Sequence, residues 1–108
     1  MSYELRVSNH FKKEAKRLVK KYSSLKLELE GVFAQLEENP KIGTSLGNDV
    51  YKLRLAIASK NKGKSGGARI IYYIEVEKIV VLLLSIYNKG EKDNISDAEI
   101  IEILKENL

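Results

Sequence analysis

The chain has no cysteine, no tryptophan, one proline and one histidine among its 108 residues. Without cysteine there is no disulfide scaffold, no thiolate metal ligand and no thiol nucleophile. The single histidine, His10, has no clustered carboxylates near it in the sequence. We therefore interpret it as a surface residue rather than as a ligand or general base. The composition predicts neither a metal site nor a cofactor.

Long apolar runs are also absent. The longest run, Ile79 to Leu84, is far shorter than the roughly 20 residues that a helix needs to cross a bilayer. The first residues contain no apolar stretch followed by a small-residue cleavage site, so we expect no secretory signal, no membrane partner and a cytoplasmic location. The length predicts one domain over residues 1–108.

Acidic residues are missing from residues 50–74. The cations of this stretch are Lys52, Arg54, Lys60, Lys62, Lys64 and Arg69. Residues 1–22 hold seven cations against two acids, whereas residues 75–108 hold four cations against eight acids. The surface is therefore predicted to be polarised. Because closely spaced like charges repel each other, the basic stretch is best explained as a surface for a polyanion, which we interpret as RNA.

Hydrophobic spacing predicts the first half of the fold. Alternation at residues 3–7 predicts a half-buried strand. Apolar stripes at helical spacing then predict two helices of similar length, the first opening at Ser8 or Asn9 and the second ending before Pro40. Two such helices with a tight joint form an αα-hairpin. Residues 42–48 are interpreted as a loop.

The second half of the chain predicts strands and a last helix. Alternating or continuous apolar residues predict strands at residues 51–57, 69–76 and 79–87. A capping box from Ser96 to Glu99 predicts the start of the helix. The fold class is therefore α+β, with an N-terminal strand, an αα-hairpin, a three-stranded antiparallel meander and a C-terminal helix.

The basic strand pair is the first candidate site. Alternation places Lys52 and Arg54 on one face of their strand, and Arg69 starts the neighbouring strand. If the hairpin register sets Arg69 beside Arg54, lysine and arginine gather in one shallow site without carboxylates. The alternative is that these charges only solvate an edge strand. The lack of any acid over this stretch favours a functional site.

A second candidate is the run of residues 87–92 directly after the last predicted strand, which contains Tyr87, Lys89, Glu91 and Lys92. The end of a strand is a rigid platform for side chains, although a solvated loop is the simpler interpretation of this segment alone.

Two motifs together resemble those of the RelE/ParE superfamily of bacterial toxins. The run KSGGAR at residues 64–69 is similar to the Lys-Ser-Gly-Gly-x-Arg turn of the HigB-like branch, and YNKGEK at residues 87–92 is similar to its Tyr-x-Lys-x-Glu-Lys run. The resemblance covers nearly the whole chain, because the predicted order of helices and strands also matches that of the superfamily.

The resemblance implies a toxin of a type II toxin–antitoxin system. Such a toxin is a ribosome-dependent mRNA endonuclease (mRNA interferase) that needs no metal, inhibits translation and arrests growth, with a cognate antitoxin, the ribosome and mRNA as partners. Two alternatives stay open: a ParE-like toxin that inhibits DNA gyrase, and a non-catalytic RNA- or ribosome-binding module.

The resemblance also assigns roles to residues of this chain. The catalytic residues that it implies are Lys52, Arg54, Arg69 and Lys89. The RNA-binding residues expected beside them are Lys60, Lys62, Lys64, Tyr87 and Lys92. The late catalytic tyrosine of RelE falls near Ser96 here, so that role is vacant and Tyr87 is the candidate to take it.

The chemistry of these side chains fits cleavage of RNA. A fork-shaped arginine such as Arg69 suits phosphoryl oxygens. A lysine crowded by other cations has a lowered pKa, which makes Lys52 the expected base, with Lys89 as donor to the leaving group.

Overall fold

The computed structural model describes residues 2–60 and 66–108. The elements in chain order are β1 (Glu4–Val7), α1 (Asn9–Lys21), α2 (Leu25–Glu38), β2 (Thr44–Gly47), β3 (Val50–Leu55), the short 3-10 helix η1 (Ala58–Lys60), β4 (Ala68–Glu75), β5 (Val80–Asn88) and α3 (Asp97–Asn107). The strands form one sheet in the order β1-β5-β4-β3-β2. β1 runs parallel to β5, and the other neighbours are antiparallel. The predicted α+β fold is confirmed.

The helices begin where the sequence predicts. The Ser8 side chain accepts a hydrogen bond from the backbone N–H of Phe11 at 3.0 Å, which caps α1. Ser96 and Glu99 form a complete capping box at the start of α3. Because these caps satisfy backbone donors that a helix leaves open, they fix the first residue of each helix.

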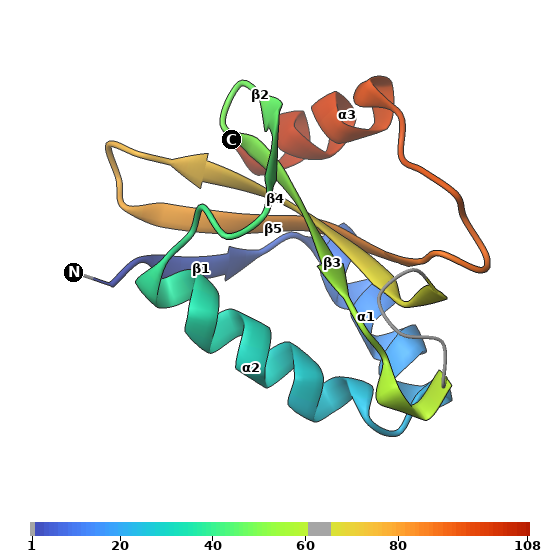
Figure 1. The fold of residues 1–108 in the computed structure, drawn as a ribbon. Helices are drawn as coiled ribbons and strands as arrows, with labels where there is room; N and C mark the ends of the chain where they lie inside the picture. Colours follow the sequence, from blue (N-terminus) through green and yellow to red (C-terminus); the bar gives the residue numbers. More distant parts are fainter. Residues whose placement is uncertain (1, 61–65) are drawn as a thin grey trace.

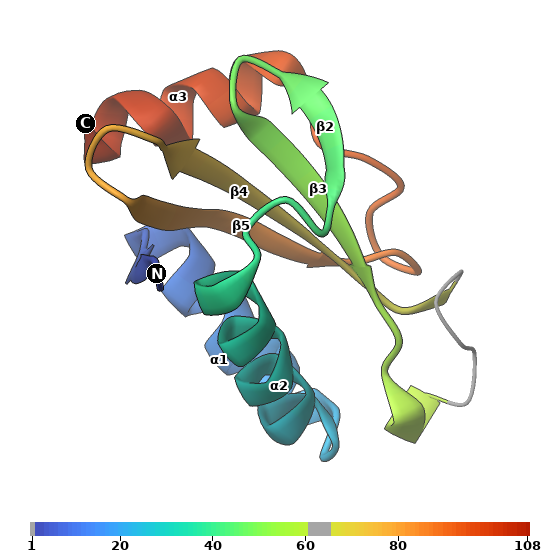
Figure 2. The same cartoon turned by 60° about the vertical axis from the view of Figure 1, so that its left-hand side comes forward.

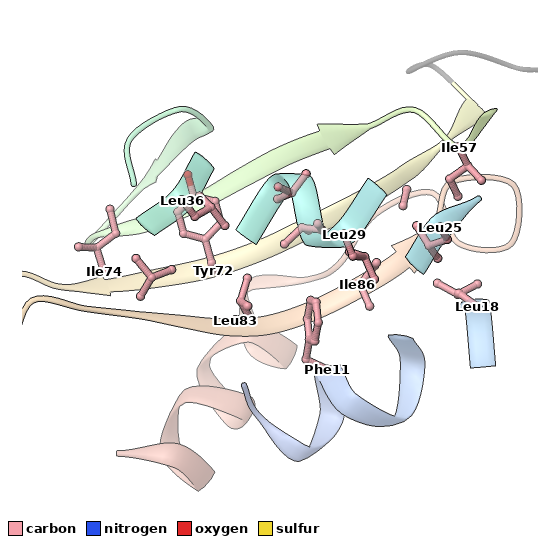
Figure 3. Close-up of a cluster of buried hydrophobic side chains, with 14 residues drawn as sticks. Phe11, Leu18, Leu25, Leu29, Leu36, Ile57, Tyr72, Ile74, Leu83 and Ile86 are labelled. Carbon is pink, nitrogen blue, oxygen red and sulfur yellow. The ribbon is translucent and has the colours of Figure 1, made fainter. Parts of the chain in front are cut away.

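Helices cover both faces of the sheet. α1 and α2 lie on one face and α3 lies on the other (Figures 1 and 2). Between the sheet and the αα-hairpin is the larger core cluster, which includes Phe11, Leu18, Tyr72 and Ile86 (Figure 3). A second cluster joins the other face to α3. All residues of β5 are buried, which explains its continuous apolar sequence. Within the described residues, no helix has the length and apolar character to cross a membrane.

Residues 42–48 differ from the prediction, because Thr44–Gly47 forms β2 rather than a loop. β2 pairs with β3 through a turn in which Asn48 and Asp49 have positive φ angles of 53° and 63°. Asn and Asp are the residues that tolerate this left-handed conformation best after glycine, and they favour tight hairpins. The antiparallel meander therefore has one strand more than predicted.

Gly67 sets the distance between β3 and β4 at the end where Leu55 pairs with Ala68 and the chain connects the two strands. A Cβ atom on this residue would overlap the carbonyl oxygen of Leu55, so the backbone would have to move to admit it. On its other side, the carbonyl oxygen of Gly67 accepts a hydrogen bond from the backbone N–H of Lys89 at 3.0 Å. Gly67 thus ties the ends of β3, β4 and β5 together.

The pairing of β4 with β5 contains a bulge. Tyr72 pairs with Leu83 and Ile71 pairs with Ser85, so Leu84 is an extra residue on β5. Before the bulge Leu83 points into the αα-hairpin core, and after it Tyr87 belongs to the α3 side. The bulge therefore reverses which residues of β5 face each layer.

The close approach of the Leu55 carbonyl oxygen to Gly67 predicts that one added methyl group destabilises the fold. We expect Gly67→Ala to lower the free energy of unfolding by about 1–3 kcal/mol, because the backbone must shift to admit the Cβ atom. The matched control is Gly31→Ala in α2, where a Cβ atom meets nothing within 4 Å and helix propensity favours alanine by about 1 kcal/mol. Urea denaturation measures both; equal effects of the two substitutions would contradict the prediction.

Candidate functional site

Two rows of paired residues build the site. Arg54 pairs with Arg69 across β3 and β4, and Arg69 pairs with Tyr87 across β4 and β5. Lys52 lies in the next row on the same face, opposite Ile71. Residues directly opposite in antiparallel strands point to one face, and Ile71 and Tyr87 belong to the α3 side. The predicted neighbourhood of Arg54 and Arg69 is therefore confirmed.

The four cations proposed as catalytic lie close enough to act on one another. Burial lowers the pKa of Lys52, and the positive charges of Arg69, Lys89 and Arg54 lower it further. The Lys52 ammonium also donates a long hydrogen bond of 3.4 Å to Oδ1 of Asn94. A crowded, partly desolvated lysine holds its proton less firmly than an ordinary one.

Arg69 and Tyr87 form the floor of the site, since each is only 4% exposed. Nη1 of Arg69 donates to the carbonyl oxygen of Ala68 at 3.2 Å. The Tyr87 hydroxyl is buried and has no hydrogen-bond partner among the described residues. Burial raises the pKa of Tyr87, opposed by the charge of Arg69. The phenol therefore stays protonated at neutral pH and keeps an unused donor next to a guanidinium.

Carboxylates border the site, contrary to the prediction of a cluster without them. Nζ of Lys89 lies 2.9 Å from Oδ1 of Asp93, and Nζ of Lys92 lies 2.7 Å from Oε2 of Glu99. These contacts lower the pKa of both acids. Lys92 also lies 5.9 Å from the centre of the Tyr87 ring. Both ion pairs are partly or largely exposed, so water and salt weaken them.

Lys60 does not join the cluster. Its ammonium donates to Oδ1 of Asn88 and lies 5.4 Å from the centre of the Tyr22 ring at the end of α1. The Asn88 amide in turn donates to the Tyr22 hydroxyl at 2.8 Å. Lys60 therefore points toward the αα-hairpin side of the sheet. The other two predicted RNA-binding lysines, Lys62 and Lys64, lie outside the described residues.

Two contacts that the sequence did not indicate contribute to the site. Asn94 is a partner of Lys52, as described above. The Glu91 carboxylate accepts hydrogen bonds from Arg17 at 3.1 and 3.2 Å and lies 3.7 Å from Nζ of Lys21. These contacts fasten the loop that carries Lys89 to α1. No local pattern predicts them, because the partners are far apart in the chain.

The fold is that of the RelE toxins. The chain is similar to a mutant of the E. coli toxin RelE in the free state, with 24% identity, complete coverage of both chains at 100%, and a TM-score of 0.67. It resembles the isolated E. coli RelE toxin with 25% identity, 99% and 100% coverage of the two chains, and a TM-score of 0.65. It also matches a chain of the intact E. coli RelBE toxin–antitoxin complex, with 26% identity, 81% and 96% coverage and a TM-score of 0.62.

The family follows from the sequence match. Residues 7–106 fit the family model of the RelE toxin of the RelE / RelB toxin–antitoxin system. This chain belongs to the RelE family and is a toxin of a toxin–antitoxin system. The expected membership is confirmed, while the HigB-like branch stays a prediction.

The unpartnered phenol predicts that removing it does not harm the fold. We expect Tyr87→Phe to raise the free energy of unfolding by about 1 kcal/mol, because a buried hydroxyl without a partner is costly. The control is Tyr72→Phe, whose hydroxyl donates to the carbonyl oxygen of Pro40 at 2.6 Å and accepts from the N–H of Gly43 at 3.0 Å. That variant should lose about 1–3 kcal/mol. Thermal and urea denaturation measure both, and a comparable loss in Tyr87→Phe would refute the assignment.

Proposed function

We propose that this toxin is a ribosome-dependent endoribonuclease that cuts mRNA by attack of a 2′-hydroxyl on the adjacent phosphate. The observation that carries the proposal is the cluster of Lys52, Arg54, Arg69 and Lys89, in which the pKa of Lys52 is lowered. Such a cluster binds a phosphodiester and also supplies a group able to accept a proton.

Lys52 is the proposed general base. The neutral amine takes the proton of the 2′-hydroxyl, and the 2′-oxygen then forms a bond to phosphorus. Because burial and neighbouring cations lower the pKa of Lys52, a larger fraction is neutral at physiological pH than for an ordinary lysine. Asn94 accepts from the Lys52 ammonium and so orients it.

Arg54, Arg69 and Tyr87 are proposed to stabilise the charge that develops on the phosphoryl oxygens. Both guanidinium groups offer forked donors to two oxygens at once. The Tyr87 hydroxyl, which has no partner among the described residues, adds a neutral donor. Donors fixed in advance by strand pairing lose little freedom when the transition state forms.

Lys89 is proposed to protonate the leaving 5′-oxygen as its bond to phosphorus breaks. The products are a 2′,3′-cyclic phosphate and a 5′-hydroxyl, and the proton gained by Lys52 balances the one lost by Lys89. The Lys89–Asp93 pair must open for this step, and it opens readily because the Asp93 side chain is 93% exposed. The steps proposed here use side chains alone and require no metal ion.

The ribosome and an antitoxin are the proposed partners. In-line attack needs the 2′-oxygen, the phosphorus and the leaving oxygen to be aligned, and a ribosome that holds the message supplies this alignment. The toxin then acts in the cytoplasm, where messages are translated. The related RelE of E. coli forms a complex with its antitoxin, and we propose that a cognate antitoxin covers the cation cluster with an acidic or apolar segment. Lys92, beside the Tyr87 ring, is a proposed RNA contact.

Cleavage is tested by mapping 5′ ends of cellular mRNA after brief induction. We expect the unmodified toxin to create new 5′-hydroxyl ends within translated messages, and Arg69→Ala to reduce them by about 10²–10³-fold, as for loss of one charge-stabilising donor. Lys78→Ala, in the exposed turn between β4 and β5, is the matched control and should cleave normally. An early DNA-damage response without new ends would indicate a gyrase inhibitor, and ribosome association without new ends would indicate a binding module.

The lowered pKa of Lys52 predicts a specific pH profile. Deprotonation activates the base, so the single-turnover rate should rise with pH to a plateau. The midpoint of this rise should lie below the ordinary pKa of lysine. Lys52→Arg keeps the positive charge and removes the base, so the rate should fall by about 10²–10⁴-fold. The increase of the rate with pH that we assign to Lys52 should also vanish in this variant. Ribosome-bound message is the substrate, and an unchanged profile in Lys52→Arg would assign the base to another group.

A further inference from the structure

α1 carries a second concentration of positive charge, outside the candidate site. This helix holds six cations and one acid, Glu14. All six cations are exposed, whereas the apolar residues Phe11 and Leu18 are buried against the sheet. Five of the cations line a shallow hollow of about 540 Å³: Lys13, Lys16, Arg17, Lys20 and Lys21. The mechanism proposed above uses none of them.

Acidic residues neutralise only part of this helix face. Arg17 pairs with Glu14 and with Glu91, each at 3.1 Å, and Lys21 shares Glu91 at 3.7 Å. The other four cations of α1 form no ion pair within residues 2–60 and 66–108. The face therefore keeps a net positive charge, which attracts a polyanion and repels other cationic surfaces.

The spacing of the unpaired lysines suits the backbone of a nucleic acid. Lys13, Lys16 and Lys20 follow one another at three and four positions, so they form a row with steps of about 5–6 Å along one helix face. Evenly repeated point charges match evenly repeated phosphates, and lysine binds phosphate without reading bases. An interfacial membrane helix needs exposed apolar side chains. In α1, Phe11 and Leu18 are buried and cannot supply them.

The α1 face and the candidate site belong to opposite sides of the sheet, as the positions of α1 and α3 show (Figure 2). They meet at one end, where Glu91 links Arg17 to the loop that carries Lys89. A ligand on α1 therefore does not cover Lys52, Arg54 and Arg69, and the two surfaces can engage different parts of one large RNA assembly.

We infer that the outward face of α1 is a second RNA-binding surface, which binds the phosphates of double-helical RNA regardless of its sequence. It rests on the proposed function only in identifying the natural ligand as ribosomal RNA. Its contribution is to hold the toxin on the ribosome, while the chemistry stays with the cation cluster across the sheet.

The test is a triple variant, Lys13→Gln, Lys16→Gln and Lys20→Gln. The control is Lys26→Gln, Lys41→Gln and Lys105→Gln, which removes the same charge from exposed positions elsewhere. The probe is a short blunt-ended RNA duplex, titrated over a range of salt concentrations. Each lost phosphate contact reduces the slope of log affinity against log salt by about 0.9, so we expect a decrease of about 2 to 3 and at least about a tenfold weaker binding at low salt. The control should keep the slope of the unmodified toxin.

A second readout separates this surface from the nuclease site. On ribosome-bound message, the α1 variant should require more ribosomes for half-maximal cleavage and keep the rate at saturation. If the unmodified toxin cleaves nothing, the proposed function fails, and the duplex titration still decides the role of α1. Equal slopes for the variant and control overturn the inference. So does a variant that keeps its affinity for the duplex but loses affinity for the antitoxin or for anionic vesicles.

Discussion

Arg54 and Arg69 lie directly opposite each other on β3 and β4, although like charges in this position repel across a strand pair. The apolar side of the same strands keeps them there. Ile70 and Tyr72 are fully buried in the core formed with the αα-hairpin. A slip of one residue would expose this set and turn the arginines inward. Hydrophobic burial thus fixes the register that sets Arg54 opposite Arg69. The phosphate binding proposed for the site depends on this register.

The acidic residues of the C-terminal third lie at the border of the cation cluster and do not neutralise it completely. Asp93 and Glu99 pair with lysines at the border of the cluster, and Glu91 connects the same loop to α1. All three carboxylates are exposed, so each holds its partner weakly and yields to a stronger anion. The polarity of the sequence therefore has two effects in the structure. It leaves α1 and the end of the sheet positive, and it places exchangeable counter-charges where phosphates are proposed to bind.

Local patterns in the sequence predict most of the fold, since caps, helical stripes and alternation are local properties. They also predict the shared face of Lys52 and Arg54. What they miss depends on contacts between distant segments or on backbone conformation. β2 was missed because its signal lies in the turn residues Asn48 and Asp49 rather than in an apolar alternation. The direction of Lys60 follows from η1, whose backbone N–H groups donate to Glu28 and Ser24 at the start of α2. The acid partners of the lysines follow from the path of a loop, which composition does not reveal.

The bulge at Leu84 bears on how relatives of this chain are compared. Strict alternation from Leu83 would place Tyr87 in the same layer as Leu83, yet the extra residue moves it across the sheet to pair with Arg69. A bulge also allows a strand to lose one residue. The deletion straightens the backbone at that point, and the residues after it keep their pairing partners. Proteins that share about a quarter of their residues, as this chain does with E. coli RelE, accumulate length changes. In an alignment with a relative that lacks the extra residue, a gap at this point keeps Tyr87 in register, whereas an ungapped alignment assigns its place to a neighbour that faces the other helical layer.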